Sequence, residues 1–242
     1  MKKLLLISTI AFVALAGCKK DNENGSNGKV KLLETLTIIG GETAKYEYDS
    51  QNRLTKCSVY YKSTIPVQPE DKLIYDGDDL IEYVCGYETE MYTKSAGKIT
   101  YRDVGNSIIL ELNSDGTLAK RSLTGENGEI WSTRTYQYQN GNLMKETTQV
   151  LDNGVLQTTG TYEYKYDNKN SPYLFGKTPK WWLILHWGDG GCGSKNNITE
   201  FVWKGGKDVA SYEYDDDGYP TKCTKIGSDG HISVREYTYI TK

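Results

Sequence analysis

The sequence predicts an all-β, water-soluble protein. An antiparallel meander of about fourteen strands is expected to form one curved sheet or a closed or nearly closed barrel, with a tryptophan-rich plug or cap loop. Polar and aromatic residues alternate, as in Tyr162-Glu163-Tyr164-Lys165-Tyr166, which is the period of a strand with one buried face. Turn signals such as Asn140-Gly141 and Asp229-Gly230 recur at close intervals and suit hairpins. No segment after the leader shows a convincing helical period.

A repeated segment explains this regularity. Tyr46–Cys57 and Tyr212–Cys223 are identical at seven of twelve positions, and looser copies lie between them. Each copy predicts a strand that ends in Tyr-x-Tyr-Asp, a tight turn, and a second strand that opens with Leu or Pro and a Lys. A strand pair of this kind buries a face only when neighbouring copies pair with it, so the repeat indicates a scaffold.

An aspartate stands at the head of several of these turns. Asp49, Asp76, Asp167 and Asp215 each follow an aromatic residue directly. An Asp side chain in this position can accept hydrogen bonds from backbone amides two residues further on. We therefore expect these residues to start turns rather than to bind ligands.

The N-terminus predicts export and lipid anchoring. A basic start is followed by a short apolar run, Leu4–Leu15, which is too short for a spanning helix and indicates a signal peptide over residues 1–17. Leu15-Ala16-Gly17-Cys18 resembles the bacterial lipobox, in which the Cys is acylated. Acylated Cys18 would make the lipid bilayer a partner. Ordinary secretion with cleavage nearby is the alternative.

Residues 18–29 read as the lipidated Cys and a polar tether, and residues 30–242 as a single β-repeat domain. Lys19-Lys20-Asp21-Asn22-Glu23 also resembles the surface-export signal of some Gram-negative lipoproteins. We therefore expect an outer-membrane location, while the surface-exposed and periplasm-facing orientations both stay open.

Composition excludes some partners and explains the core. The net charge is −3 and no basic patch stands out, so nucleic acid is not an expected partner. The chain is poor in aliphatic residues but contains 20 Tyr and 5 Trp. Tyrosine buries its ring and keeps its hydroxyl at a wet edge, which suits a thin sheet layer.

Four cysteines remain beyond Cys18, namely Cys57, Cys85, Cys192 and Cys223. Cys57 and Cys223 occupy the same place in two repeat copies, which puts them several strands apart unless the sheet closes. We expect buried free thiols, with a disulfide as the alternative. Because no Cys-x-x-Cys is present and no His lies near the strand cysteines, no metal site or cofactor is expected.

The connection from Asn168 to Asn197 is the candidate plug. It holds Trp181, Trp182 and Trp187 around the apolar run Leu183-Ile184-Leu185. So apolar a segment needs a covering partner, and the simplest is the interior of the sheet. The alternative is a ligand site in which Trp181, Trp182, His186 and Trp187 offer ring faces to a glycan or a hydrophobic ligand.

Three further patterns are candidates for a catalytic or metal-binding site. His186, Asp189, Cys192 and Ser194 lie close in sequence, yet the local signature of a cysteine nucleophile is missing. His231 follows Asp229-Gly230 and reads as an exposed hairpin residue. The acidic clusters at 76–79 and 215–218 lack the spacing of a calcium loop, so hairpin turns explain them.

The Tyr-x-Tyr-Asp units resemble those of Tyr-Asp (YD/RHS-like) repeat proteins. Together with Tyr166-Asp167-Asn168-Lys169-Asn170-Ser171-Pro172-Tyr173 and Ser194–Thr199, they resemble more closely an uncharacterised bacterial lipoprotein domain with a porin-like β-fold. This resemblance covers about residues 30–242, implies a fold and a cell-surface context, and supplies no catalytic residue. An integral porin fits poorly, because alternate residues of 53–61 place polar and apolar side chains on both faces.

Two functions follow from these features. The first is a membrane-anchored binding module for a glycan or a surface protein. The second is a polysaccharide hydrolase with paired carboxylates from different strands. A concave site holding two carboxylates, one of them desolvated, would favour the enzyme.

Overall fold

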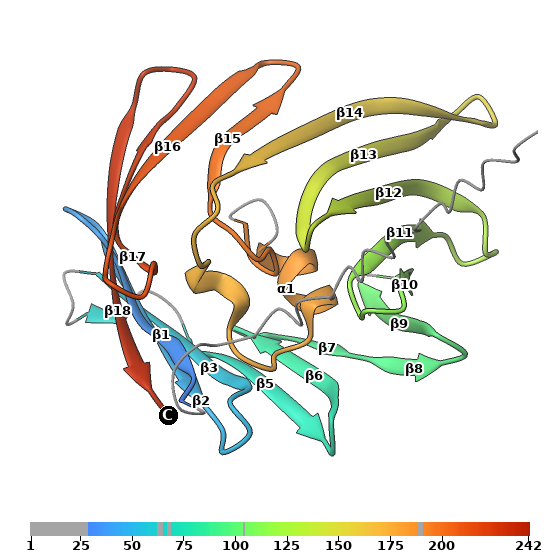
Figure 1. Ribbon diagram of the computed structural model, residues 1–242. Coiled ribbons are helices and arrows are strands. Elements are labelled where there is room, and N and C mark those ends of the chain that lie inside the picture. The colour runs from blue at the N-terminus through green and yellow to red at the C-terminus, as the bar shows by residue number, and fades with distance from the viewer. Residues whose placement is uncertain (1–28, 62–64, 67–68, 104, 188–190) are drawn as a thin grey trace, which may run out of the picture.

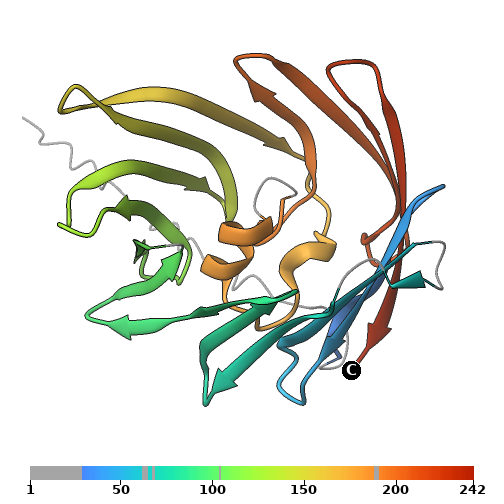
Figure 2. The ribbon, with the colours of Figure 1, turned by 180° about the vertical axis from the view of Figure 1, so that it is seen from behind.

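The computed structural model describes residues 29–61, 65–66, 69–103, 105–187 and 191–242. The described residues form one sheet of eighteen strands that curls round a short helical segment (Figure 1). The same arrangement is seen from behind in Figure 2. The strands are β1 Lys31–Ile38, β2 Glu42–Tyr48, β3 Leu54–Tyr61, β4 Ile65–Pro66, β5 Asp71–Asp76, β6 Asp79–Cys85, β7 Glu88–Met91, β8 Thr93–Ser95, β9 Lys98–Asp103, β10 Asn106–Leu112, β11 Leu118–Thr124, β12 Ile130–Gln139, β13 Asn142–Asp152, β14 Val155–Tyr166, β15 Ile198–Trp203, β16 Gly206–Tyr214, β17 Pro220–Ile226 and β18 Ile232–Thr241.

The predicted antiparallel meander is confirmed, and it closes on itself. Consecutive strands pair antiparallel, and β18 returns to pair with β1 from Lys31↔Thr241 to Ile38↔Arg235. The predicted number of about fourteen strands was too low. Tyr92 separates β7, which pairs with β6, from β8, which pairs with β9. The two-residue strand β4 is counted separately from β5 in the same way, because both pair with β3 at different positions along it.

Each residue type of the repeat has a fixed structural role. In the first copy Glu47 and Lys56 pair across the strands and form an ion pair of 2.6 Å on the outer face. In the second copy Glu213 and Lys222 do the same at 3.1 Å. The cysteine that follows each Lys is buried on the inner face, so the repeat encodes one outward ion pair and one inward thiol.

A bulge in each copy changes which side chains face inward. Glu47 pairs with Lys56 but Tyr48 pairs with Leu54, which leaves Thr55 as an extra residue. Its hydroxyl donates to the carbonyl of Glu47 at 3.1 Å. The bulge puts Leu54 and Cys57 on one buried face, so the strict alternation assumed over residues 53–61 was wrong.

The Asp-headed turns all lie at one end of the barrel, because alternate turns of a meander share an end. We call this the Asp-turn end, and the opposite end the far end. Asp49 accepts from the backbone N–H of Gln51 and Arg53, both at 2.9 Å. Asp215 accepts from Asp217 and Tyr219 at 3.1 and 2.9 Å. The turn role predicted for these aspartates is confirmed.

The plug connects β14 to β15 and lies inside the ring of strands in both views (Figures 1 and 2). It contains the 3₁₀ helix η1 Pro172–Leu174 and the α-helix α1 Lys180–Trp187. Trp182 and Leu183 are fully buried, which confirms the predicted plug. The expectation that no helix follows the leader was wrong. A helix surrounded on several sides by protein carries apolar residues all round and shows no amphipathic period.

The outer face of the barrel carries charged pairs across neighbouring strands. Lys145 lies 3.3 Å from Glu163, and Lys165 lies 2.8 Å from Glu200, with all four side chains at least partly exposed. Among the described residues, no helix is both long enough and apolar enough to span a bilayer. The exposed side chains of these two ion pairs suit contact with water.

Candidate functional site

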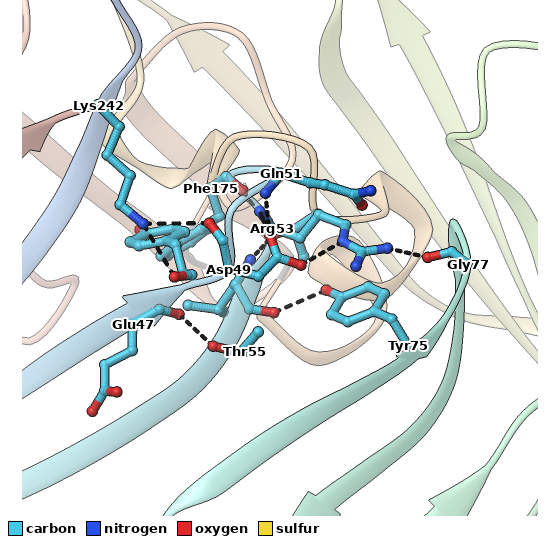
Figure 3. A network of polar contacts seen from close by, with 12 residues as sticks. Glu47, Asp49, Gln51, Arg53, Thr55, Tyr75, Gly77, Phe175 and Lys242 are labelled. Carbon is cyan, nitrogen blue, oxygen red and sulfur yellow. Dashed lines mark hydrogen bonds and ion pairs between the residues drawn. The ribbon is translucent and has the colours of Figure 1, made fainter.

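The plug is fastened to the turn between β2 and β3, as Figure 3 shows. The backbone N–H of Lys177 donates to the carbonyl of Asn52 at 3.0 Å, and Gly176 forms a β-bridge with Arg53. Thr178 Oγ1 accepts from the N–H of Leu54 at 2.8 Å. The entry of the plug is thus held by backbone groups as well as side chains.

Arg53 links this turn to the next one (Figure 3). Its Nε donates to Asp49 at 2.7 Å, and Nη1 donates to the carbonyl of Gly77 in the β5–β6 turn. Its guanidinium lies 4.1 Å from the ring centroid of Tyr75. Lys242 Nζ adds hydrogen bonds to the carbonyls of Tyr48 and Asp49 at 3.1 and 3.3 Å. The Asp-turn end is therefore a connected polar network.

Both ends of the plug connection are fastened to other turns at the Asp-turn end. Lys195 N–H donates to the carbonyl of Gly141 at 3.0 Å, and Asn196 N–H donates to Asn142 at 2.9 Å. Asn170 N–H donates to the carbonyl of Gly218 at 3.0 Å. These bonds fix the plug against the β12–β13 and β16–β17 turns.

A cavity of about 360 Å³ opens where the plug enters the barrel, and we call it the Asp-turn cavity. Its floor is apolar and consists of side chains from three strands and the plug. The floor residues are Leu80, Tyr92, Ile99, Leu112 and Trp181. Concave sites of this size, with an apolar floor and a few polar groups, are typical for small ligands.

Charged side chains of both signs form the rim of the Asp-turn cavity. Three carboxylates and three ammonium groups line it, namely Asp78, Asp79, Asp115, Lys94, Lys177 and Lys180. Lys94 and Asp79 form an ion pair of 2.5 Å. The hydrogen bond from the Thr117 hydroxyl, opposed by burial, holds the pKa of Asp115 below its usual value, so this carboxylate is charged. The rim is balanced in charge and can both donate and accept hydrogen bonds.

The four predicted ligand-binding residues have different surroundings in the structure. Trp181 lies in the floor of the Asp-turn cavity and is 6% exposed. Trp182 is completely buried against Tyr83, with ring centroids 4.9 Å apart. Trp187 contacts Phe175 at 5.4 Å and Trp182 at 4.9 Å. The packing of Trp182 and Trp187 favours the plug role, and only Trp181 belongs to a cavity described here.

His186 takes part in a polar cluster inside the barrel. Its Nε2 lies 3.2 Å from Glu90 and 3.1 Å from the Tyr92 hydroxyl, which itself donates to Glu90 at 2.5 Å. Burial would raise the pKa of Glu90, but the hydrogen bond and charge of His186 outweigh it and lower the pKa. Glu90 is therefore ionised at neutral pH.

The other histidine and cysteine patterns do not form a site. Ser194 is buried and bonds to the N–H of Leu143 and the hydroxyl of Tyr166, whereas the polar partners of His186 are Glu90 and Tyr92. Asp189, like Cys18, lies outside the described residues. His231 is exposed in its hairpin, as predicted.

Cys57, Cys85 and Cys223 are free thiols within the described structure. Cys57, Cys192 and Cys223 are buried as predicted, while Cys85 is exposed, contrary to the expectation of burial. Burial and the charge of Asp71 raise the pKa of Cys57 to about 12. In the part of the chain that the structure describes, no group of three His, Cys, Asp or Glu side chains is arranged to hold a metal ion.

The rim of the Asp-turn cavity was not predicted from sequence. Its residues come from the β5–β6 turn, β8, the β10–β11 turn and the plug, which are far apart along the chain. None of these segments carries a ligand-binding pattern of its own. Only closure of the barrel brings the six charges together.

Comparison with known proteins supports the fold alone. No protein-family model matches the chain, and no curated protein matches it. The structure is similar to the crystal structure of a porin-like protein from Bacteroides uniformis ATCC 8492, with a TM-score of 0.51. The two chains are 17% identical, and the match covers 88% of this chain and 96% of the other. This likeness confirms the expected porin-like β-fold.

Proposed function

We propose that this protein is a lipid-anchored binding module of the outer membrane, held by acylated Cys18, that binds a glycan in the Asp-turn cavity. The observation that carries the proposal is this cavity of about 360 Å³ with an aromatic floor and a charge-balanced rim. A surface protein ligand is a weaker candidate, because the cavity is concave and small.

The chemistry of the cavity suits an uncharged, polyhydroxylated ligand. Tyr92 and Trp181 offer aromatic surface to the apolar side of a sugar ring. Rim carboxylates accept from hydroxyl groups, and rim ammonium groups donate to them. Because three charges of each sign are present, a neutral ligand meets no net repulsion.

The start of β1 supports attachment from the end where the cavity opens. β1 starts beside the Asp-turn end, where Lys31 pairs with Asp215 at 2.5 Å. The exposed ion pairs of the outer face support a barrel in water, tethered rather than inserted.

The alternative function, a polysaccharide hydrolase, has less support. Asp71 is a desolvated carboxyl, since burial raises its pKa against the hydrogen bonds of Cys85 and Tyr83. Glu90 is a second carboxyl inside the barrel. Neither of them lines the Asp-turn cavity, and the rim carboxylates there do not include a desolvated acid paired with a base: the pKa of Asp115 is lowered, not raised.

A glycan array followed by calorimetric titration of the best glycan tests the binding proposal. The double variant Lys177→Ala/Lys180→Ala removes two exposed rim donors, and we expect at least tenfold weaker binding from the loss of about 1.5 kcal/mol or more. Lys204→Ala, which removes an exposed lysine of the β15–β16 turn, is the matched control and should bind as the parent does. Equal affinity of the double variant and the control would contradict the site.

A further inference from the structure

A second cavity, of about 160 Å³, lies on the inner wall formed by β15 to β18, and we call it the wall cavity. Tyr212 pairs with Cys223, and Cys223 pairs with Arg235, so the three side chains form one row on the same face. That face is the inner one, because Tyr237, two residues beyond Arg235, is buried in the core. Lys225, two residues beyond Cys223, continues the wall cavity toward the far end.

Arg235 is a cation inside the barrel without an anionic partner. Its Nε is buried and has no hydrogen-bond partner. The rest of its guanidinium has the hydroxyl of Tyr173 as a hydrogen-bond partner, with Tyr237 and Cys223 nearby, and within the described residues it forms no ion pair with a carboxylate. An uncompensated guanidinium out of water is costly, whereas a bound anion would satisfy it with strong, directional hydrogen bonds.

The second cation of the wall cavity is already paired. Lys225 lies 2.7 Å from Asp208, and Asp208 also accepts from the N–H of Ser228 at 3.1 Å. Both charged residues line the cavity with Arg235. The wall cavity therefore holds two cations and one carboxylate, which leaves one positive charge for a ligand.

The ring of Phe201 lines the same cavity and belongs to a row of aromatic rings. Phe201 lies 5.1 Å from Tyr164, 5.9 Å from Tyr162 and 5.0 Å from Trp203, measured between ring centroids. The interplanar angles are 24°, 11° and 30°, so the rings are close to parallel. Such a surface accepts the apolar side of a ring-shaped ligand.

We propose that the wall cavity binds an organic monoanion of the sugar-acid type, with Arg235 holding its carboxylate and Phe201 contacting its ring. The bidentate fork of a guanidinium matches a carboxylate, which favours this group over a neutral hydroxyl. This site shares no lining residue with the Asp-turn cavity, so one barrel would recognise a neutral and an acidic sugar at two separate sites.

Calorimetric titration of the protein with glucuronate tests this inference, with glucose as the uncharged control ligand. We expect saturable binding of glucuronate. Arg235→Gln should reduce glucuronate affinity at least tenfold and leave the heat signal of glucose unchanged, because a neutral sugar is assigned to the Asp-turn cavity. No glucuronate binding by the parent protein, or an unchanged glucuronate affinity in folded Arg235→Gln, would overturn the proposal.

Two further variants keep the test decisive if Arg235→Gln fails to fold, as judged by far-ultraviolet circular dichroism. Lys225→Gln leaves Asp208 unpaired, so repulsion should weaken glucuronate binding. Asp208→Asn removes the competing carboxylate, so glucuronate should bind more tightly. The opposite order of these two affinities, or no difference between them, would also overturn the site.

Discussion

Tyrosine hydroxyls close the ends of many hairpins by donating to a backbone carbonyl on the neighbouring strand. The donor and acceptor pairs are Tyr48 and Leu33, Tyr75 and Leu54, Tyr138 and Leu118, Tyr166 and Leu143, Tyr212 and Ile198, and Tyr239 and Pro220. The distances lie between 2.6 and 2.9 Å. A ring that fills the thin core thus also satisfies a carbonyl near a strand end.

Tyr138→Phe tests how much one of these hydroxyl groups contributes to the stability of the fold. The Tyr138 hydroxyl donates to Leu118 at 2.8 Å, and the variant leaves that carbonyl without its partner. We expect the free energy of unfolding to fall by about 1–2 kcal/mol, measured by urea denaturation. Tyr87→Phe is the control, since Tyr87 is 96% exposed, and it should change nothing. Equal stabilities of the two variants would refute this role of the hydroxyl.

Single residues were predictable where their partners are near in sequence. Asp49 and Asp215 bond to amides two and four residues away, so the pattern itself indicated their turn role. The tyrosine hydroxyls reach across to another strand, and Tyr138 meets a carbonyl 20 residues away. Sequence spacing carries no signal for such a contact, and this function of the repeat was missed.

Hairpins are the unit in which the repeat acts. In both close copies the hairpin pairs an outward Glu with an outward Lys, starts its turn at Asp, and carries a bulge directly after the turn. The strands and turns were predictable from alternation and from Asp-Gly or Asn-Gly signals. The bulges were not predictable. One extra residue such as Thr55 leaves the composition unchanged, but it changes which side chains of the strand face inward.

The β16–β17 turn should respond to pH through Asp215. Burial would raise its pKa, but Lys31 and the turn amides outweigh burial and lower it below the ordinary 3.8. A carboxylate with a lowered folded pKa stabilises the fold above its unfolded pKa, and this contribution is lost as pH falls through the folded value. Acidification below 3.8 should therefore remove it.

Asp215→Asn makes this dependence measurable. We expect the variant to lose about 1 kcal/mol of unfolding free energy at pH 7, and the difference from the parent to shrink toward zero below pH 3.8. Urea titrations at several pH values give both quantities. Asp216→Asn alters the exposed neighbouring residue and serves as the control. A difference independent of pH would show that charge is not what Asp215 contributes.

The barrel as a whole depends on its plug. Sequence indicated an apolar connection that the sheet must cover, because three Trp surround Leu183-Ile184-Leu185. Closure between β1 and β18 joins residues about 200 positions apart, and local patterns cannot fix such a pairing. The charged residues of the Asp-turn cavity and the wall cavity come from separate strands and the plug, which is why they carried no signal in the sequence.

Gly176→Ala tests whether the plug and the barrel act as one structure. A Cβ at Gly176 would lie 2.1 Å from the Asn52 carbonyl oxygen, and φ there is +62°. The latch formed by the Lys177 amide and the Arg53 bridge must then open. Gly154→Ala is the matched control, because φ is +79° but open space surrounds the new methyl group. The control should lose about 1–2 kcal/mol for its left-handed backbone.

We expect Gly176→Ala to lose at least about 2 kcal/mol more than the control, because backbone and not a flexible side chain has to move. Urea denaturation followed by tryptophan fluorescence gives the stabilities. Near-ultraviolet circular dichroism should also weaken only in Gly176→Ala, since the rings of Phe175, Trp182 and Trp187 lose their fixed packing. An equal loss of unfolding free energy in both variants would contradict this prediction. It would mean that the barrel does not need the latch for its stability and that the plug and the barrel do not act as one structure.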